Sequence, residues 1–157
     1  MAVQPQDLQI IKAASQLGGA IGTEAAGGAN ELFGAVTGSQ SSAGSTEYAC
    51  AYLVNESSQT AISVTVYISS EDDHEGVSVD MGLGTSLIGG EEQEIADEFT
   101  APLGVAFTET QPSGNAVLIG SMPAGSHKAI WLRMTVPPGT SAANFNYAIT
   151  VLAETEA

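Results

Sequence analysis

The residues best suited to chemistry in this sequence are carboxylates, and many of them lie in two short runs. The run "EDDHE" at 71–75 places four carboxylates and one imidazole within five residues. Asp72, Asp73 and Glu75 could bind Ca²⁺ through their oxygen atoms, but the run lacks the alternating acid spacing of a calcium-binding loop. We therefore expect a solvated loop here, and another at "EEQE" (91–94), on an acidic surface. No metal ion or other cofactor is predicted.

No other arrangement of reactive residues predicts an enzyme. The sequence has no G-x-S-x-G, H-E-x-x-H or C-x-x-C motif, and "GLGTSLIGG" (82–90) lacks the lysine of a phosphate-binding loop. Paired carboxylates can hydrolyse sugars, but the chain has few aromatic residues with which to line a sugar-binding cleft. Cys50, the single cysteine, lies in an apolar strand pattern that is typical of a buried thiol.

The charge balance excludes several classes of partner. The chain has 3 basic and 18 acidic residues, for a net charge of −15. Binding to nucleic acid or to an anionic membrane surface requires clusters of Lys and Arg, so neither partner is expected. The N-terminus lacks the pattern of a secretory signal, and no window has the length and apolarity of a membrane span. We expect a protein that is made in a cytoplasm and is not exported by a standard route.

Two of the three basic residues flank the only tryptophan, in a strand predicted at 126–136. Trp131 and Arg133 share one face of this strand, close enough for contact between guanidinium and indole. Lys128 lies at the beginning of the strand, from where its side chain can reach outward to solvent. Trp131 and Arg133 either cap a second apolar surface within the domain or form a contact patch for a partner. The opposite, core-facing side of the strand is expected to carry Ile130, Leu132, Met134 and Val136.

From residue 47 onward, apolar residues recur with the two-residue period of half-buried strands. Strands without intervening helices predict an all-β domain at 47–157, an antiparallel β-sandwich of immunoglobulin-like or jelly-roll topology. The segment 91–107 is ambiguous. The other predicted strands span 47–56, 60–70, 77–84 and 144–154, and the segment 115–125 is predicted to contain a strand and a turn. In the strand at 60–70, Ile62, Val64, Val66 and Ile68 are expected to share a face.

Residues 1–46 are predicted to form an extended, glycine-rich N-terminal arm, because glycine at this density disfavours regular structure. A short helix is expected at 7–17, with Asp7 as its N-cap and Gly18 after its end. Four apolar residues in the arm need a surface to lie on, either in the chain's own domain or on a neighbour. These candidate partner-binding residues are Ile21, Leu32, Phe33 and Val36.

Several segments, in order along the chain, resemble a group of virion structural proteins of tailed bacteriophages. The strand "EYACAYLVNES" resembles their "EYRCxYxKN", and "TAPLGVAF" is similar to "NTAPxGVxF". The segment "IGSMPAGSHKAIWLRMTVPPGTSAANF" resembles "IGDLxxGxxxAVWxRRTVPAGxSAxN", and the arm is similar to their "LGGAI…NLFDxVSGxESAAGxxEY". This copy departs from the pattern by losing basic residues: Ala49 replaces Arg, Leu53 or Val54 replaces Lys, and Met134 replaces the second Arg.

The resemblance implies a non-enzymatic virion component, and a small sandwich with an arm suits a capsid decoration (cement) protein on the exterior of a phage head. Its expected partners are the major capsid protein or other virion proteins. A homo-oligomer is also expected, a trimer first and a dimer second, because closed symmetric assemblies are the rule. The alternatives are a neck or tail accessory protein, or a β-sandwich module that binds carbohydrate or an ion.

Overall fold

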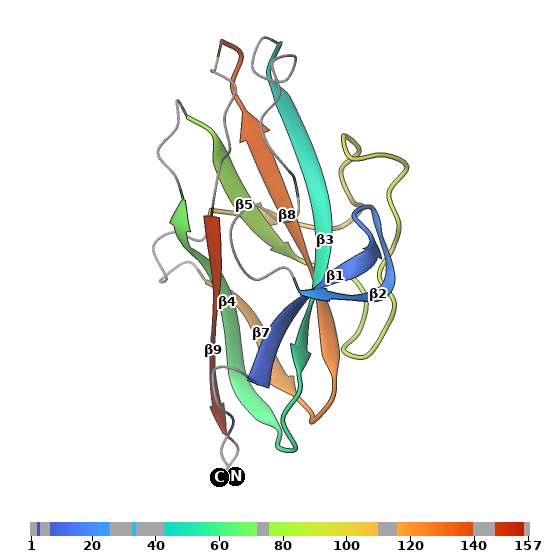
Figure 1. The fold of residues 1–157 in the computed structure, drawn as a ribbon, viewed down its shortest axis with the longest axis vertical. Helices are drawn as coiled ribbons and strands as arrows, with labels where there is room; N and C mark the ends of the chain where they lie inside the picture. Colours follow the sequence, from blue (N-terminus) through green and yellow to red (C-terminus); the bar gives the residue numbers. More distant parts are fainter. Residues whose placement is uncertain are drawn as a thin grey trace.

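The computed structural model describes residues 3, 7–25, 33, 43–71, 76–109, 116–139 and 147–155. In these residues the chain forms two antiparallel sheets that pack face to face, so the expected all-β sandwich is confirmed (Figure 1). The strands are β1 (Leu8–Ser15), β2 (Gly18–Ala25), β3 (Ser45–Asn55), β4 (Ala61–Glu71), β5 (Ser78–Leu83), β6 (Phe107–Thr108), β7 (Val117–Met122), β8 (His127–Val136) and β9 (Tyr147–Thr155).

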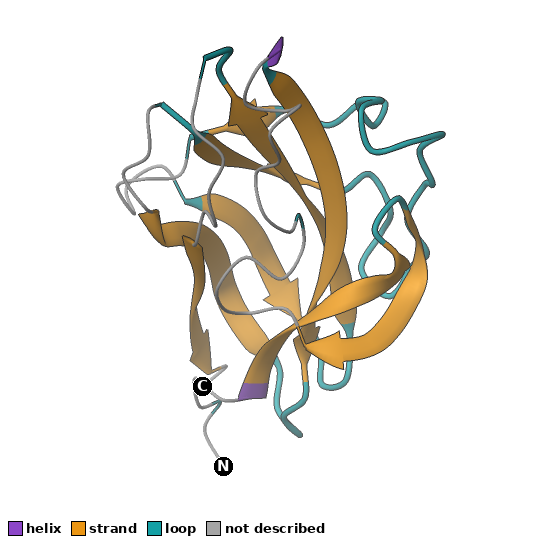
Figure 2. Cartoon of the chain, turned by 45° about the horizontal axis from the view of Figure 1, so that its top comes forward, coloured by secondary structure: helices purple, strands orange, loops and turns teal. Residues whose placement is uncertain are grey.

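The larger sheet has the strand order β2-β1-β3-β8-β5-β6, and the smaller sheet has the order β7-β4-β9. The main core lies between them, because each sheet turns one apolar face toward the other. Val64, Val66 and Ile68 of β4 belong to the same buried cluster as Leu53 of β3 and Leu132 of β8. Figure 2 shows the two layers, with the β1–β2 hairpin projecting beside the loops.

The predicted strands from residue 47 onward agree with the structure to within a few residues. In β8 the side chains of Ile130, Leu132 and Met134 face the main core as expected. In β4 one expectation is wrong: Ile62 is half-buried and lies outside the core that contains Val64. The cause is a bulge, since Ser63 has a φ of 53° and the strand register shifts between Ile62 and Thr65.

The helix predicted at 7–17 is wrong, because residues 8–15 form β1. This strand pairs with β3, with Ile10 opposite Leu53, and both side chains are buried in the main core. Pairing along an open sheet edge satisfies every second backbone group and buries apolar side chains, whereas a helix of this length is marginal. Residues 8–25 therefore belong to the sandwich, and the boundary predicted at 46 does not separate them from it.

The central strands β3 and β8 are buried on both faces. One face is covered by the small sheet, and the other by the β1–β2 hairpin and by residues 84–106, which we call the covering loop. In Figure 1 this loop, in yellow-green and yellow, lies on the far side of the large sheet from β4 and β9. A second buried cluster fills the space beneath it and contains Cys50, Tyr52, Ile95 and Trp131.

Candidate functional site

Trp131 is the centre of the second cluster and is fully buried. It lies between Cys50 of β3 and Gly82 of β5, and its indole Nε1 donates a hydrogen bond of 2.7 Å to Glu92 Oε2. Of the two roles considered for Trp131, the structure shows the first: it caps a second apolar surface within the domain. Its side chain is not accessible to a partner while the covering loop is in place.

Glu92 holds the covering loop on Trp131, although the sequence predicted a solvated carboxylate there. Its side chain is buried and also accepts hydrogen bonds from the backbone N–H groups of Thr85 and Ser86, each at 2.8 Å. Burial raises the pKa of Glu92, but the hydrogen bonds from Trp131, Thr85 and Ser86 outweigh burial and hold this pKa below its ordinary value of 4.5. The buried group is therefore a carboxylate at neutral pH.

The prediction that the side chain of Lys128 reaches outward to solvent is wrong. Its side chain is buried, and Nζ donates a hydrogen bond to the backbone carbonyl of Ser86 in the covering loop. Burial lowers the pKa of Lys128, and the neighbouring Glu92 carboxylate opposes this shift. The scarce positive charge on β8 thus serves an internal purpose, since it fixes the loop that covers Trp131.

Arg133 is held by Asp80, its cross-strand partner on β5. The guanidinium Nη2 lies 2.7 Å from Asp80 Oδ2, and Nε donates a second hydrogen bond of 3.2 Å to the same oxygen. The guanidinium also stacks over the ring of Phe107, 4.9 Å from its centroid. The expected contact between Arg133 and Trp131 is therefore wrong: the guanidinium stacks on Phe107 of β6, and the indole of Trp131 bonds to Glu92.

Two of the arm's candidate partner-binding residues contact the chain's own domain. Ile21 is half-buried against the second cluster, and the ring of Phe33 lies 6.3 Å from that of Tyr147 at the main core. Leu32 and Val36 lie outside the described residues.

The three acidic candidates for a metal site, Asp72, Asp73 and Glu75, also lie outside the described residues. Within the ranges that the structure describes, no group of three His, Cys, Asp or Glu side chains is placed to hold a metal ion. The same ranges contain no helix that is long and apolar enough to cross a membrane.

The outer side of the covering loop presents large apolar side chains to solvent. Leu87 and Leu103 are 83% and 82% exposed, and Phe99 is 57% exposed. The exposed acidic residues Glu91, Glu94 and Asp97 come from the same loop, which has no Lys or Arg. We call the three apolar residues and these carboxylates the loop surface. Exposed large apolar side chains in a segment that also carries exposed charges are typical of sites of protein–protein contact.

Hydrogen bonds hold the loop surface in one conformation. The side chain of Gln93 accepts a bond of 3.0 Å from the Leu103 N–H and donates one of 2.7 Å to the Leu103 carbonyl. The Asp97 carboxylate accepts a bond of 3.0 Å from the N–H of Phe99. The turn after Leu87 is tied to β8, because the Gly89 N–H donates to the His127 carbonyl at 2.8 Å. The apolar side chains are therefore presented by a fixed backbone, which reduces the entropy lost on binding.

Sequence reasoning missed both Glu92 and the loop surface. An acidic run is typical of a solvated loop. No neighbouring residue in the sequence indicates that one of its carboxylates bonds to a tryptophan 39 residues away. A signal for the loop surface was present. Leu103 directly precedes Gly104, which has a φ of 74°, and turns of this kind usually carry polar residues.

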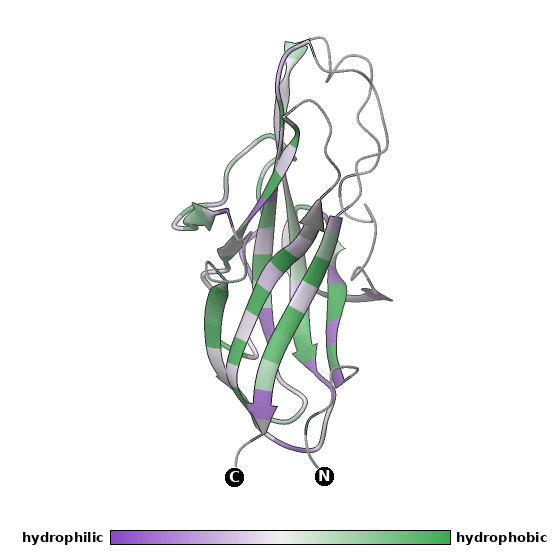
Figure 3. Cartoon of the chain, turned by 90° about the vertical axis from the view of Figure 1, so that its left-hand side faces the viewer, coloured by the Kyte–Doolittle hydropathy of each residue, from purple (hydrophilic) through white to green (hydrophobic). Residues whose placement is uncertain are grey.

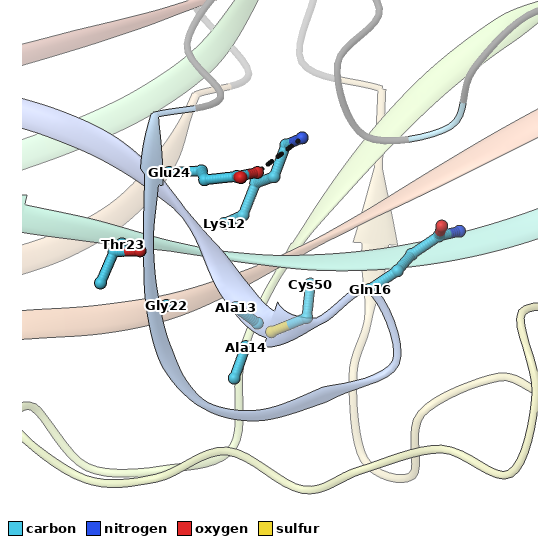
Figure 4. A pocket seen from close by; sticks show the side chains of 8 residues that line it. All are labelled: Lys12, Ala13, Ala14, Gln16, Gly22, Thr23, Glu24 and Cys50. Carbon is cyan, nitrogen blue, oxygen red and sulfur yellow. Dashed lines mark ion pairs between the residues drawn. The ribbon is translucent and has the colours of Figure 1, made fainter.

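A cavity of about 550 Å³ is lined by residues of β1, β2 and β3, beside the register shifts of the β1–β2 pair (Figure 4). Lys12 and Glu24 pair with each other at 3.5 Å on its lining, and Cys50 lies in its wall. Burial, followed by the charge of Glu92, raises the pKa of the Cys50 thiol far above neutral pH. The thiol is therefore protonated and is not an activated nucleophile.

No family model, curated protein or solved structure matches this chain. The loop surface is consequently assigned from the geometry and sequence of the chain itself.

Proposed function

We propose that this chain is a non-enzymatic virion structural protein that decorates the exterior of a bacteriophage head. The observation that carries the proposal is the packing of the segments that resemble phage virion proteins. "EYACAYLVNES" covers most of β3 and the two residues after it, and "AIWLRMTV" lies in β8. "TAPLGVAF" spans the end of the covering loop and the first residue of β6. These segments touch in the fold. Cys50 is opposite Trp131, the ring of Phe107 contacts the ring of Tyr48, and the guanidinium of Arg133 stacks over the ring of Phe107.

The residues shared with the family pattern have structural roles in this unit. Asn55, the last residue of the "EYRCxYxKN" match, is buried and its side-chain amide donates to the carbonyls of Gln59 and Met122, each at 2.9 Å. Tyr52 donates through its hydroxyl to the Gly19 carbonyl at 2.5 Å and accepts from the Glu92 N–H at 2.9 Å. These long-range contacts of the matched residues support the proposal.

The loop surface is the part of the molecule that we propose to bind the capsid shell. Leu87, Phe99 and Leu103 act as apolar anchors, and the carboxylates around them select a partner with basic residues at the rim of its apolar pockets. The major capsid protein is the proposed partner. Because attraction between the rims is screened by salt, binding is expected to weaken as ionic strength rises.

A binding titration on virions of the phage that encodes the chain tests this proposal. The purified protein is expected to saturate particles stripped of it at hundreds of copies, and Leu87→Asp/Leu103→Asp is expected to reduce its affinity at least tenfold. Both leucines are largely exposed, so the variant should keep its melting temperature. Binding of tens of copies or fewer would instead indicate the neck or tail, and no binding to any part of the virion would refute the proposal.

A further inference from the structure

The outer face of the small sheet carries a row of side chains that is left open to solvent. Thr65 of β4 is opposite Leu118 of β7 on one side and Leu152 of β9 on the other. Residues directly opposite each other in a sheet point to the same face, so the three side chains are neighbours. Leu118 is 63% exposed and Leu152 is 51% exposed, although both lie in the middle of a sheet.

The apolar character of this face extends along β4. The bulge at Ser63 turns Ile62 outward, opposite the exposed Glu154. On the other side of Thr65, the half-buried Tyr67 is opposite Thr150. We call the face formed by Ile62, Thr65, Tyr67, Leu118 and Leu152 the small-sheet face. Its one carboxylate is that of Glu154, at the end of the face beside Ile62, whereas the loop surface has three.

Charge is nearly absent from the three strands that form this sheet. Their sequences contain only Glu71 and Glu154, which lie near opposite ends of the β4–β9 pair. Figure 3 shows β7, β4 and β9 as green and pale bands, with strong purple at the lower end of β9. The large sheet, in contrast, carries charged residues in β1, β2, β3, β5 and β8. In a chain with a net charge of −15, a face whose one charge lies at its end is a distinctive feature.

We propose that the small-sheet face binds a second copy of this chain. Two copies repel each other through their net charge, and the repulsion is strongest where acidic surfaces meet. The face has one carboxylate, that of Glu154 at its end, so contact through it places few carboxylates against each other and buries exposed leucines. A basic partner would gain more at the acidic loop surface. Because the same face is presented by both copies, the contact is isologous and closes as a two-fold dimer.

The size of the face predicts a weak dimer. Three strands about 4.8 Å apart, over about six residues that rise about 3.3 Å each, present on the order of 300 Å² of sheet. Stable interfaces bury about 800 Å² on each partner. The dimer is therefore expected only at high protein concentration, or where copies are held side by side on a surface. Salt is expected to strengthen it, because about 1 M salt shortens the Debye length to about 3 Å and screens the mutual repulsion.

Sedimentation equilibrium of the full chain tests this inference without any virion, so its outcome is independent of the proposed function. Between about 20 μM and about 1 mM protein in about 1 M NaCl, the average mass is expected to rise from that of a monomer toward that of a dimer. Leu118→Asp/Leu152→Asp is expected to weaken this association at least tenfold. The matched control, Leu87→Asp/Leu103→Asp, adds the same charge to the loop surface and is expected to leave the association unchanged.

Both double variants change exposed side chains, and circular dichroism verifies that each is folded. If the aspartate variant of the small-sheet face does not fold, Leu118→Ser/Leu152→Ser replaces it and is expected to weaken association in the same way. The inference is overturned if the native chain stays monomeric throughout this range. It is also overturned if a folded small-sheet variant associates as strongly as the native chain, or if the loop variant abolishes association.

Discussion

At the scale of single residues, the fold depends on a buried carboxylate that joins Trp131 to the covering loop. Glu92 accepts hydrogen bonds from the indole and from two backbone N–H groups, so its loss would leave several buried donors without a partner. A buried donor without a partner typically destabilises a protein by about 1–3 kcal/mol. Glu92 therefore stabilises the fold through its charged form.

We predict that Glu92→Gln lowers the free energy of unfolding by about 2–4 kcal/mol at pH 7, because an amide accepts through one oxygen only. The pKa of Glu92 is lowered on folding, so its contribution is fully present above the unfolded value near 4.5 and is lost as pH falls through the folded value. The stability difference between the native chain and the variant should therefore shrink below about pH 4.5. Urea unfolding at several pH values measures it, and a difference that does not change with pH would contradict the role of the charge.

Strand periodicity predicted the faces of the individual residues in β8 correctly. The alternation of Ile130, Leu132 and Met134 with Trp131 and Arg133 separates the main core from the second cluster. Periodicity could not predict the partners of Lys128 and Arg133, because Ser86 and Asp80 are brought to them only by the fold. An inward-facing lysine that bonds a loop carbonyl has the same sequence pattern as one that extends into solvent.

At the scale of elements, the β1–β2 hairpin and the covering loop support each other. Gly18 begins β2 with a φ of 110°, and the N–H of Ile95 donates to the Leu17 carbonyl at 2.8 Å. A Cβ atom on Gly18 would overlap the backbone carbonyl of Gln93 and lie 3.2 Å from the Trp131 ring. The close approach of the two elements thus requires glycine at this position.

We predict that Gly18→Ala destabilises the protein by about 1–3 kcal/mol more than Gly120→Ala does. Both glycines have a φ near 100°, but a Cβ on Gly120 meets no atom within 4 Å. The difference between the two variants therefore measures the contact of the hairpin with the loop, apart from backbone strain. Thermal or urea unfolding measures it, and equal losses of stability would show that this contact is loose.

The elements that the sequence predicted are those with a clear two-residue period. The strands β3, β5 and β8 were recognised because their apolar residues alternate, whereas β1 was interpreted as a helix. Its residues "LQIIKAAS" fit the period of a helix as well as that of a strand. They form a strand because they pair with the edge of β3, which lies 30 or more residues away in the chain. The covering loop had no period to recognise, since its hydrogen bonds run to other segments.

At the scale of the whole molecule, the distribution of charge separates two surfaces. The loop surface combines exposed apolar side chains with three carboxylates, and the small-sheet face has a single carboxylate, that of Glu154, at its end. Salt should act on them in opposite directions, because it screens attraction to a basic partner and also screens repulsion between copies. The sequence predicted the β-sandwich and an acidic protein that acts by binding other proteins. It could not predict the two surfaces, because they depend on strand register and on a bulge.

The measurement that tests the proposed function most directly is a reconstruction of the virion at a resolution that shows individual strands. We predict density for this sandwich on the outside of the head, in hundreds of copies, with Leu87, Phe99 and Leu103 facing the major capsid protein. Density for the chain inside the head, in the neck or tail, or nowhere on the particle would contradict the proposal. So would a sandwich on the head whose covering loop points away from the shell.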